Sequence, residues 1–122
     1  MTVRGLGALE AAVMGVLWDA AGAVKVRHVV DVLAADRPVA YTTVMTVLDN
    51  LHRKGWVLRE KSGRAYLYAP MWSREQATAR ALRGLLDESS DPEGALLHFA
   101  RSVSPSESAV LRAALTDPDA GR

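Results

Sequence analysis

The sequence contains no cysteine, and this absence excludes disulfide bonds, thiolate metal sites and cysteine nucleophiles. It also lacks an unbroken apolar run of about 18 residues, the length that a membrane-spanning helix needs, so no membrane insertion is expected. The N-terminal segment is not typical of a signal peptide, because the acidic residue Glu10 interrupts its apolar stretch. Together these absences favour a cytoplasmic protein.

Motifs for catalysis and cofactor binding are missing as well. The sequence has neither the GxxxxGKS/T pattern that cradles phosphates nor the GxSxG pattern of a serine nucleophile. His28, His52 and His98 lie on three different predicted helices and lack the spacing of metal ligands. We therefore expect no enzyme activity, no cofactor and no metal site.

The chain has little net charge, only +1, but its charges are unevenly distributed. Residues 1–70 hold nine Lys and Arg against six Asp and Glu, whereas residues 71–122 hold six against eight. Within residues 51–64, five basic side chains accompany one acidic side chain. A basic segment of this kind is typical of a surface that binds a polyanion, although a solvated turn would carry the same charges.

What the sequence does contain is a spacing of apolar residues that predicts six helices and one hairpin. Three helices come first, over about residues 6–20, 26–35 and 41–54. A hairpin follows, with strands over 56–61 and 65–69 around the turn Ser62-Gly63-Arg64. Three further helices begin at the capping residues Ser73, Asp91 and Ser104. The predicted fold is mainly α with a small β-hairpin: a winged helix-turn-helix domain over residues 1–72 and a helical dimerisation arm over residues 73–122.

The predicted helix over residues 41–54 has the pattern of a helix that enters the major groove of DNA. Its apolar stripe, Val44-Val47-Leu48-Leu51, recurs at i, i+3, i+4 and i+7 and is expected to be buried. Short polar side chains that can contact base edges occupy its other face, and basic side chains that can bind phosphates follow. The predicted DNA-binding residues are Thr42, Thr43, Met45, Thr46, Asn50, Arg53, Lys54, Arg59, Lys61 and Arg64.

Two alternatives to this interpretation stay open. The hydroxyl of Thr46 could contact a phosphate, or bond back to a carbonyl of its own helix, instead of reading a base. The same helices and hairpin could also form a module that binds only protein.

The leucine-rich helices after Pro70 are predicted to form the interface of a homodimer, because three short helices bury little surface unless they meet a partner. A dimer would also present two reading helices to the two halves of an inverted repeat. Two alternatives stay open for these helices. They could form a second core within the same chain, or they could enclose a small-molecule site in a ligand-sensing regulator. The predicted interface residues are Leu82, Leu85, Leu86, Leu96, Leu97, Phe99, Val103, Val110, Leu111 and Leu115.

Residues 40–48, Ala-Tyr-Thr-Thr-Val-Met-Thr-Val-Leu, closely resemble the BlaI/MecI family of penicillinase repressors. The opening helix, the pair Lys54-Gly55 and residues 66–70, Tyr-Leu-Tyr-Ala-Pro, add to a resemblance that extends over about residues 4–115. It implies a homodimeric repressor that binds an inverted-repeat operator in double-stranded DNA and controls antibiotic-resistance genes, those for β-lactamases or penicillin-binding proteins. By position, it assigns recognition to Thr42, Thr43, Thr46 and Asn50.

The resemblance also implies that a membrane sensor protease ends repression by cutting in the C-terminal region. Where the best-known members have an Asn-Phe bond at the cut, this sequence has His98-Phe99. Some of those members also carry basic residues where this sequence has Thr42 and Asn50, so a different operator is expected. The related copper-responsive CopY-type repressors end in a cysteine-rich metal motif, which this sequence lacks.

Overall fold

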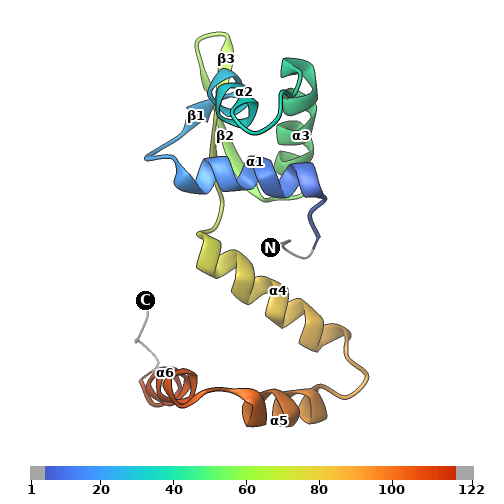
Figure 1. Ribbon diagram of the computed structural model, residues 1–122, viewed down its shortest axis with the longest axis vertical. Coiled ribbons are helices and arrows are strands. Elements are labelled where there is room, and N and C mark those ends of the chain that lie inside the picture. Colours follow the sequence, from blue (N-terminus) through green and yellow to red (C-terminus); the bar gives the residue numbers. More distant parts are fainter. Residues whose placement is uncertain (1–4, 118–122) are drawn as a thin grey trace. The chain divides into compact units, whose positions relative to one another are not determined.

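The computed structural model describes residues 5–117, and Figure 1 shows the order of its elements. The chain forms two compact units, Met1–Ala81 and Leu82–Arg122. Their boundary falls inside the helix α4 (Arg74–Glu88), whereas the predicted boundary precedes that helix. The last five residues of the predicted dimerisation arm, 118–122, lie outside the described residues.

Three helices build the core of the first unit: α1 (Ala8–Asp19), α2 (Val26–Ala34) and α3 (Tyr41–Arg53). Each begins and ends within two residues of the predicted limits. The stripe of α3 is buried as predicted, with Val44, Leu48 and Leu51 fully covered. They pack in one cluster with apolar side chains of α1 and α2, among them Val13, Leu17 and Val29. This packing fixes which face of α3 is left for solvent.

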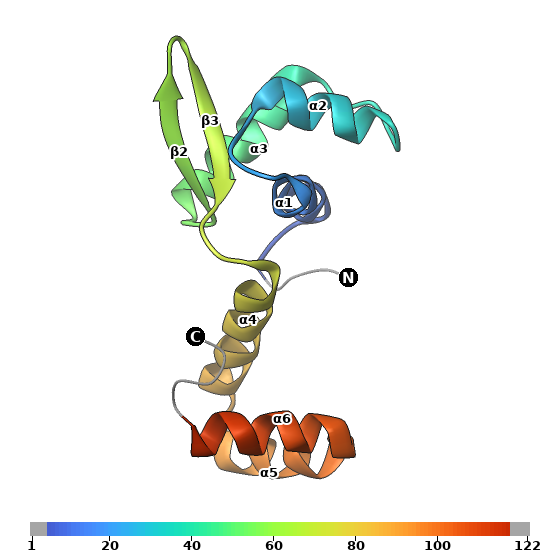
Figure 2. The ribbon, with the colours of Figure 1, turned by 90° about the vertical axis from the view of Figure 1, so that its left-hand side faces the viewer.

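A three-stranded antiparallel sheet completes the unit, in the order β1-β3-β2. The strands β2 (Val57–Ser62) and β3 (Ala65–Pro70) form the predicted hairpin, which extends away from the helices in Figure 2. Gly63 has φ +64°, and among the described residues only glycines have a positive φ. This matches a two-residue turn with glycine in its first position. The winged helix-turn-helix fold is therefore confirmed.

The prediction of a lone hairpin was incomplete, because β1 (Val24–Lys25) pairs with the outer side of β3. Val24 lies opposite Tyr68, and Lys25 lies opposite Leu67. A strand of two residues is too short to show an alternating pattern, so the sequence gives no signal for it.

Gly55 ends α3 as predicted. It has φ +81°, and its N–H donates to the carbonyl of His52 at 3.1 Å. The next N–H, that of Trp56, donates to the carbonyl of Leu51 at 2.9 Å. These two bonds form a Schellman motif, which satisfies carbonyls that the helix end would leave unpaired.

Tryptophans attach the first part of α4 to the first unit. The indole N–H of Trp18 donates to the carbonyl of Trp72 at 2.8 Å, and the rings of Trp56 and Trp72 meet edge to face at 5.5 Å. The guanidinium of Arg80 lies 3.9 Å from the centre of the Trp72 ring, and Ala77 is fully buried. The beginning of α4 is thus part of the winged domain.

We expect a fragment that ends at Ala81 to be more stable than one that ends at Trp72, by about 1–2 kcal/mol. The longer fragment keeps the cation–π contact of Arg80 and the buried Ala77, which together contribute on this scale. Urea unfolding of both fragments measures the difference. Equal unfolding midpoints would instead place the domain boundary at residue 72.

The second unit contains the end of α4, α5 (Pro92–Ser102) and α6 (Pro105–Thr116). The three predicted caps are present: Gln76 N–H donates to Ser73 Oγ, Gly94 N–H to Asp91 Oδ1 and Glu107 N–H to Ser104 Oγ. The Ser104 N–H in return holds the pKa of the Glu107 carboxyl below its usual range. These local contacts explain why each helix begins where it does.

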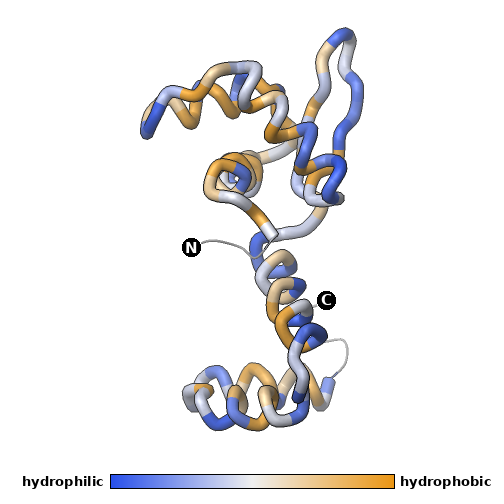
Figure 3. The backbone as a smooth tube through the Cα atoms, turned by 90° about the vertical axis from the view of Figure 1, so that its right-hand side faces the viewer, coloured by the Kyte–Doolittle hydropathy of each residue, from blue (hydrophilic) through white to orange (hydrophobic). Residues whose placement is uncertain are grey.

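The helices α5 and α6 have no buried residue within the described part of the chain. Hydrophobic residues nevertheless recur along both helices in Figure 3. The exposed side chains include Leu96, Leu97, Phe99, Val110 and Leu115. Of the other predicted interface residues, Leu82, Leu85 and Leu111 are also exposed, whereas Leu86 and Val103 are partly covered.

No helix within residues 5–117 combines the length and the apolar character needed to cross a membrane.

Candidate nucleic-acid interface

The exposed face of α3 carries the residues predicted to read DNA. Its buried stripe faces the core, and the side chains of Thr42, Thr43, Met45 and Thr46 are exposed to solvent. Asn50, one turn further on, is partly covered. The helix therefore presents a row of short polar side chains around one methionine, which suits the floor of a major groove.

The threonine hydroxyls differ in what they contact. Thr46 Oγ1 donates to the carbonyl of Thr42 at 3.0 Å, which is the back-bonded geometry that the sequence left as an alternative. Its proton is thus engaged within the helix, while its methyl group and its lone pairs stay available. The hydroxyl of Thr43 has no hydrogen-bond partner among the described residues, so it can both donate and accept.

Two predicted contact residues hold each other. The guanidinium of Arg53 donates to Oδ1 of Asn50, three residues earlier on the same helix. This bond uses one of the two lone pairs of the Asn50 amide oxygen, and the amide protons remain. A bidentate contact of Asn50 with adenine, which uses both the amide oxygen and the NH₂ group, would therefore share this oxygen with Arg53.

Lys54 has a structural role that the sequence did not reveal. Its ammonium group lies 2.9 Å from Oε1 of Glu10 on α1 and 3.4 Å from the carbonyl oxygen of Gly5. Burial of the Glu10 carboxyl acts to raise its pKa, but the Gly7 N–H and the Lys54 ammonium outweigh it and hold the pKa below its usual range. This ion pair stabilises the fold above the usual pKa of Glu10 and is lost as the pH falls through the lowered pKa.

Arg59 on β2 is also engaged rather than free. Its Nη1 lies 3.1 Å from Oδ1 of Asp49 on α3, and its guanidinium lies 4.3 Å from the centre of the Tyr66 ring. Only 24% of the Arg59 side chain is exposed. The predicted phosphate contact of Arg59 therefore competes with a contact that joins the wing to α3.

Lys61 and Arg64 remain as the freely exposed cations of the wing. Arg64 follows Gly63 in the turn between β2 and β3, at the tip of the hairpin. No ion pair is formed by either side chain with the described residues. Both side chains are thus free to bind phosphate or to enter the minor groove that flanks a bound site.

We expect Arg64→Ala to weaken binding to every DNA sequence about equally, because phosphate contacts carry no sequence information. The slope of log K against log salt should fall by roughly one unit. Titrations over a range of salt concentrations measure it, and Glu60→Ala on β2 of the same hairpin provides a control that removes a side chain but no cation. An unchanged slope in Arg64→Ala would remove the wing tip from the interface.

Three residues of this surface, Arg27, Tyr41 and Asp49, have contacts for which the sequence gives no signal. Arg27, at the start of α2, lies 4.9 Å from the centre of the Tyr41 ring at the start of α3. Asp49, on the polar face of α3, has no role predicted from the sequence, yet it pairs with Arg59. The Arg27–Tyr41 and Asp49–Arg59 contacts each join two elements that are separate in the sequence, so no local pattern predicts them.

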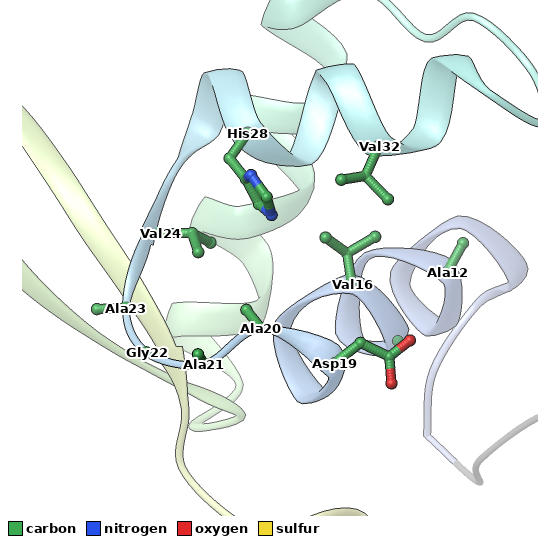
Figure 4. A pocket seen from close by; sticks show the side chains of 11 residues that line it. Ala12, Val16, Asp19, Ala20, Ala21, Gly22, Ala23, Val24, His28 and Val32 are labelled. Atoms are coloured by element: carbon green, nitrogen blue, oxygen red, sulfur yellow. The ribbon is translucent and has the colours of Figure 1, made fainter.

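A hollow of about 770 Å³ lies between α1 and α2, and none of its lining residues belongs to the predicted DNA-binding set. In Figure 4, His28 and Val32 of α2 point toward Val16 of α1 across this hollow. His28 and Val32 are exposed, so the hollow is open to solvent. Among the described residues no polar or charged side chain is buried, so no sequestered polar group lines the hollow to hold a small molecule.

The sequence profile of the penicillinase repressor family matches residues 6–117. The chain belongs to the penicillinase repressor family. A transcriptional regulator BlaI of Mycobacterium tuberculosis (strain CDC 1551 / Oshkosh) is 41% identical over 119 residues, which cover 95% of this chain and 86% of the relative. The resemblance inferred from residues 40–48 is thereby confirmed.

Solved structures agree with this assignment of the penicillinase repressor fold. The DNA-binding domain of the repressor BlaI, determined in solution, is 25% identical with a TM-score of 0.52, and the match covers 60% of this chain and 88% of that domain. The monomeric form of Bacillus licheniformis BlaI, in complex with the blaP half-operator, is 24% identical with a TM-score of 0.50, over 61% of this chain and 89% of that one. The curated relatives are transcriptional regulators rather than enzymes. The winged helix of this family member is the DNA-binding part of a transcriptional repressor.

Proposed function

We propose that this penicillinase repressor binds an inverted-repeat operator in double-stranded DNA as a homodimer. The observation that carries the proposal is the division of α3 into a buried stripe and an exposed row of threonines, beside a wing that ends in Arg64. A helix held in this way can enter the major groove while the wing contacts the backbone. Two copies related by a two-fold axis would then bind two half-sites.

The dimer is supported by the apolar surface of the second unit. Leu115 is 82% exposed and Val110 is 69% exposed, and neither α5 nor α6 buries a residue within the described chain. Apolar surface left in water is unfavourable by about 25 cal/mol per Å², so covering it with a second copy is a strong driving force. Leu82 and Leu85 of α4 and Leu96 and Leu97 of α5 are exposed as well.

We propose that the protein acts in the cytoplasm. The genes that it regulates are proposed to be those of the β-lactam response, as the family resemblance implies. Proteolysis by a membrane sensor protease is the proposed end of repression. His98 and Phe99 are both exposed, but the bond between them lies inside α5, where Ser102 Oγ also donates to the Phe99 carbonyl at 2.6 Å. A protease therefore has to unwind α5 locally before it can cut there.

Selection of duplexes from a randomised pool by the purified full-length protein tests this proposal. We expect an enriched inverted repeat whose half-sites are separated by about one helical turn, roughly 10 base pairs, or a multiple of it. The enriched duplex is called the selected operator below. Enrichment of asymmetric sites would contradict the dimeric reading of DNA, and a lack of any enrichment would contradict sequence-specific binding.

A further inference from the structure

An acidic residue lies on the exposed face of the reading helix. Asp49 is the single acidic residue of α3, and 55% of its side chain is exposed. A carboxylate at this place repels the phosphates of any DNA that the helix approaches. Its presence on a surface that binds a polyanion therefore calls for a physical reason.

The contacts of Asp49 supply that reason. Its carboxylate lies 3.1 Å from the guanidinium of Arg59, which in turn stacks on Tyr66 at 4.3 Å from the ring centre. We call Asp49, Arg59 and Tyr66 the wing clasp. The clasp joins α3 to both strands of the wing, because Arg59 belongs to β2 and Tyr66 to β3.

A shallow space beside the clasp lies between the helix and the wing. Its volume is about 320 Å³, and it is lined by the clasp together with Met45, Thr46 and Tyr68. Met45 and Thr46 are among the predicted DNA-binding residues, so the clasp borders the surface that is proposed to read sequence. Arg59 contacts Tyr66 and Tyr68 as well as Asp49, but of these partners it is the Asp49 carboxylate that competes with a phosphate for the charge of the arginine.

We propose that Asp49 is a specificity-determining residue, which holds Arg59 away from phosphates and fixes the wing against α3. This inference rests on the proposed function and adds to it a device that favours one DNA sequence over others. On unrelated DNA, where affinity comes almost entirely from phosphate contacts, holding back one arginine lowers affinity. On the operator, the fixed wing meets the backbone in the orientation that the seated helix requires, and this gain offsets the withheld charge.

Asp49→Asn removes the charge that holds Arg59 and keeps the shape of the side chain. We expect the affinity of this variant for a scrambled duplex to rise by roughly five- to tenfold at 0.1 M salt, with a salt slope steeper by about one unit. Its affinity for the selected operator should rise much less, because the freed arginine gains a phosphate while the wing loses its orientation. The ratio of the two affinities should therefore fall by about fivefold.

The effect must act through Arg59, and a double-mutant cycle tests this. In an Arg59→Gln background, Asp49→Asn is expected to leave the salt slope unchanged, because no arginine remains to be released. Glu60→Gln, which removes the same charge from an exposed neighbour on β2, serves as a matched control and should leave the affinity ratio unchanged. Competition titrations of the full-length protein with both duplexes provide all of these values.

Each other outcome overturns the inference. If Asp49→Asn raises the affinity for both duplexes equally, with and without Arg59, then Asp49 acts only through its general repulsion of DNA. Equal losses on both duplexes would make the clasp merely structural. If the wild type itself does not prefer the selected operator, the proposed function fails, and the salt slope of Asp49→Asn still decides whether Asp49 withholds Arg59.

Discussion

Replacing Phe99 by aspartate is expected to make the protein monomeric and to weaken its binding to the selected operator by about 100-fold. Phe99 is 51% exposed on α5, a helix without a buried residue in the described chain, so the substitution removes nothing from the core of the protomer. In a dimer the same position would be covered, and a buried unpaired carboxylate is strongly unfavourable. Loss of the dimer removes the avidity gained from a second linked half-site, which is worth a factor of about 10² or more.

His98→Asp provides the matched control for Phe99→Asp. It introduces the same charge one residue away, but His98 lies with Arg101 on the polar side of α5, and both are exposed. We expect this variant to stay dimeric in sedimentation equilibrium at micromolar concentration and to keep its operator affinity. A Phe99→Asp protein that sediments as a dimer, or binds the operator as tightly as the wild type, would place the interface elsewhere. Binding of both variants to a half-site duplex should be equal, because the winged domain is untouched.

Local signals in the sequence were sufficient to predict the six helices and the hairpin of this fold, although not the short strand β1. The stripe Val44-Val47-Leu48-Leu51 is buried because its spacing puts the four side chains on one face of α3. Ser73, Asp91 and Ser104 begin helices because each side chain accepts a hydrogen bond from an N–H three residues later. Gly55 and Gly63 occupy the two chain reversals around β2 that need a positive φ.

Contacts between distant segments could not be predicted in the same way. Lys54 and Glu10 are 44 residues apart, and Trp18 and Trp72 are 54 apart. Each residue of such a pair reads as an ordinary surface or core residue until the fold brings its partner to it. The missed pairing of Asp49 with Arg59 belongs to this class. Arg59 looks like an unbound cation in the sequence, yet only 24% of its side chain is exposed in the structure.

The reading threonines of α3 form an intermediate case, because the sequence predicted their exposure but not the direction of their hydroxyl protons. Thr46 Oγ1 donates to the carbonyl of Thr42 at 3.0 Å, whereas the hydroxyl of Thr43 has no partner among the described residues. A proton already engaged in the helix is not available to a base acceptor unless that bond breaks. We therefore expect the two threonines to contribute to specificity in different ways.

Thr43→Val is expected to weaken binding to the selected operator by about 1–3 kcal/mol, roughly 5- to 150-fold, which is the range for one good base contact. Thr46→Val should change operator affinity by less than about threefold, because valine keeps the methyl group and the only donated bond it loses is to a carbonyl of the same helix. Both variants leave the buried stripe intact, so both should fold normally.

Competition binding to operator and scrambled duplexes at fixed salt measures the losses of affinity caused by Thr43→Val and Thr46→Val. If Thr46→Val is the more damaging substitution on the operator, its hydroxyl must turn away from the Thr42 carbonyl to read a base; if Thr43→Val weakens both duplexes equally, Thr43 contacts a phosphate.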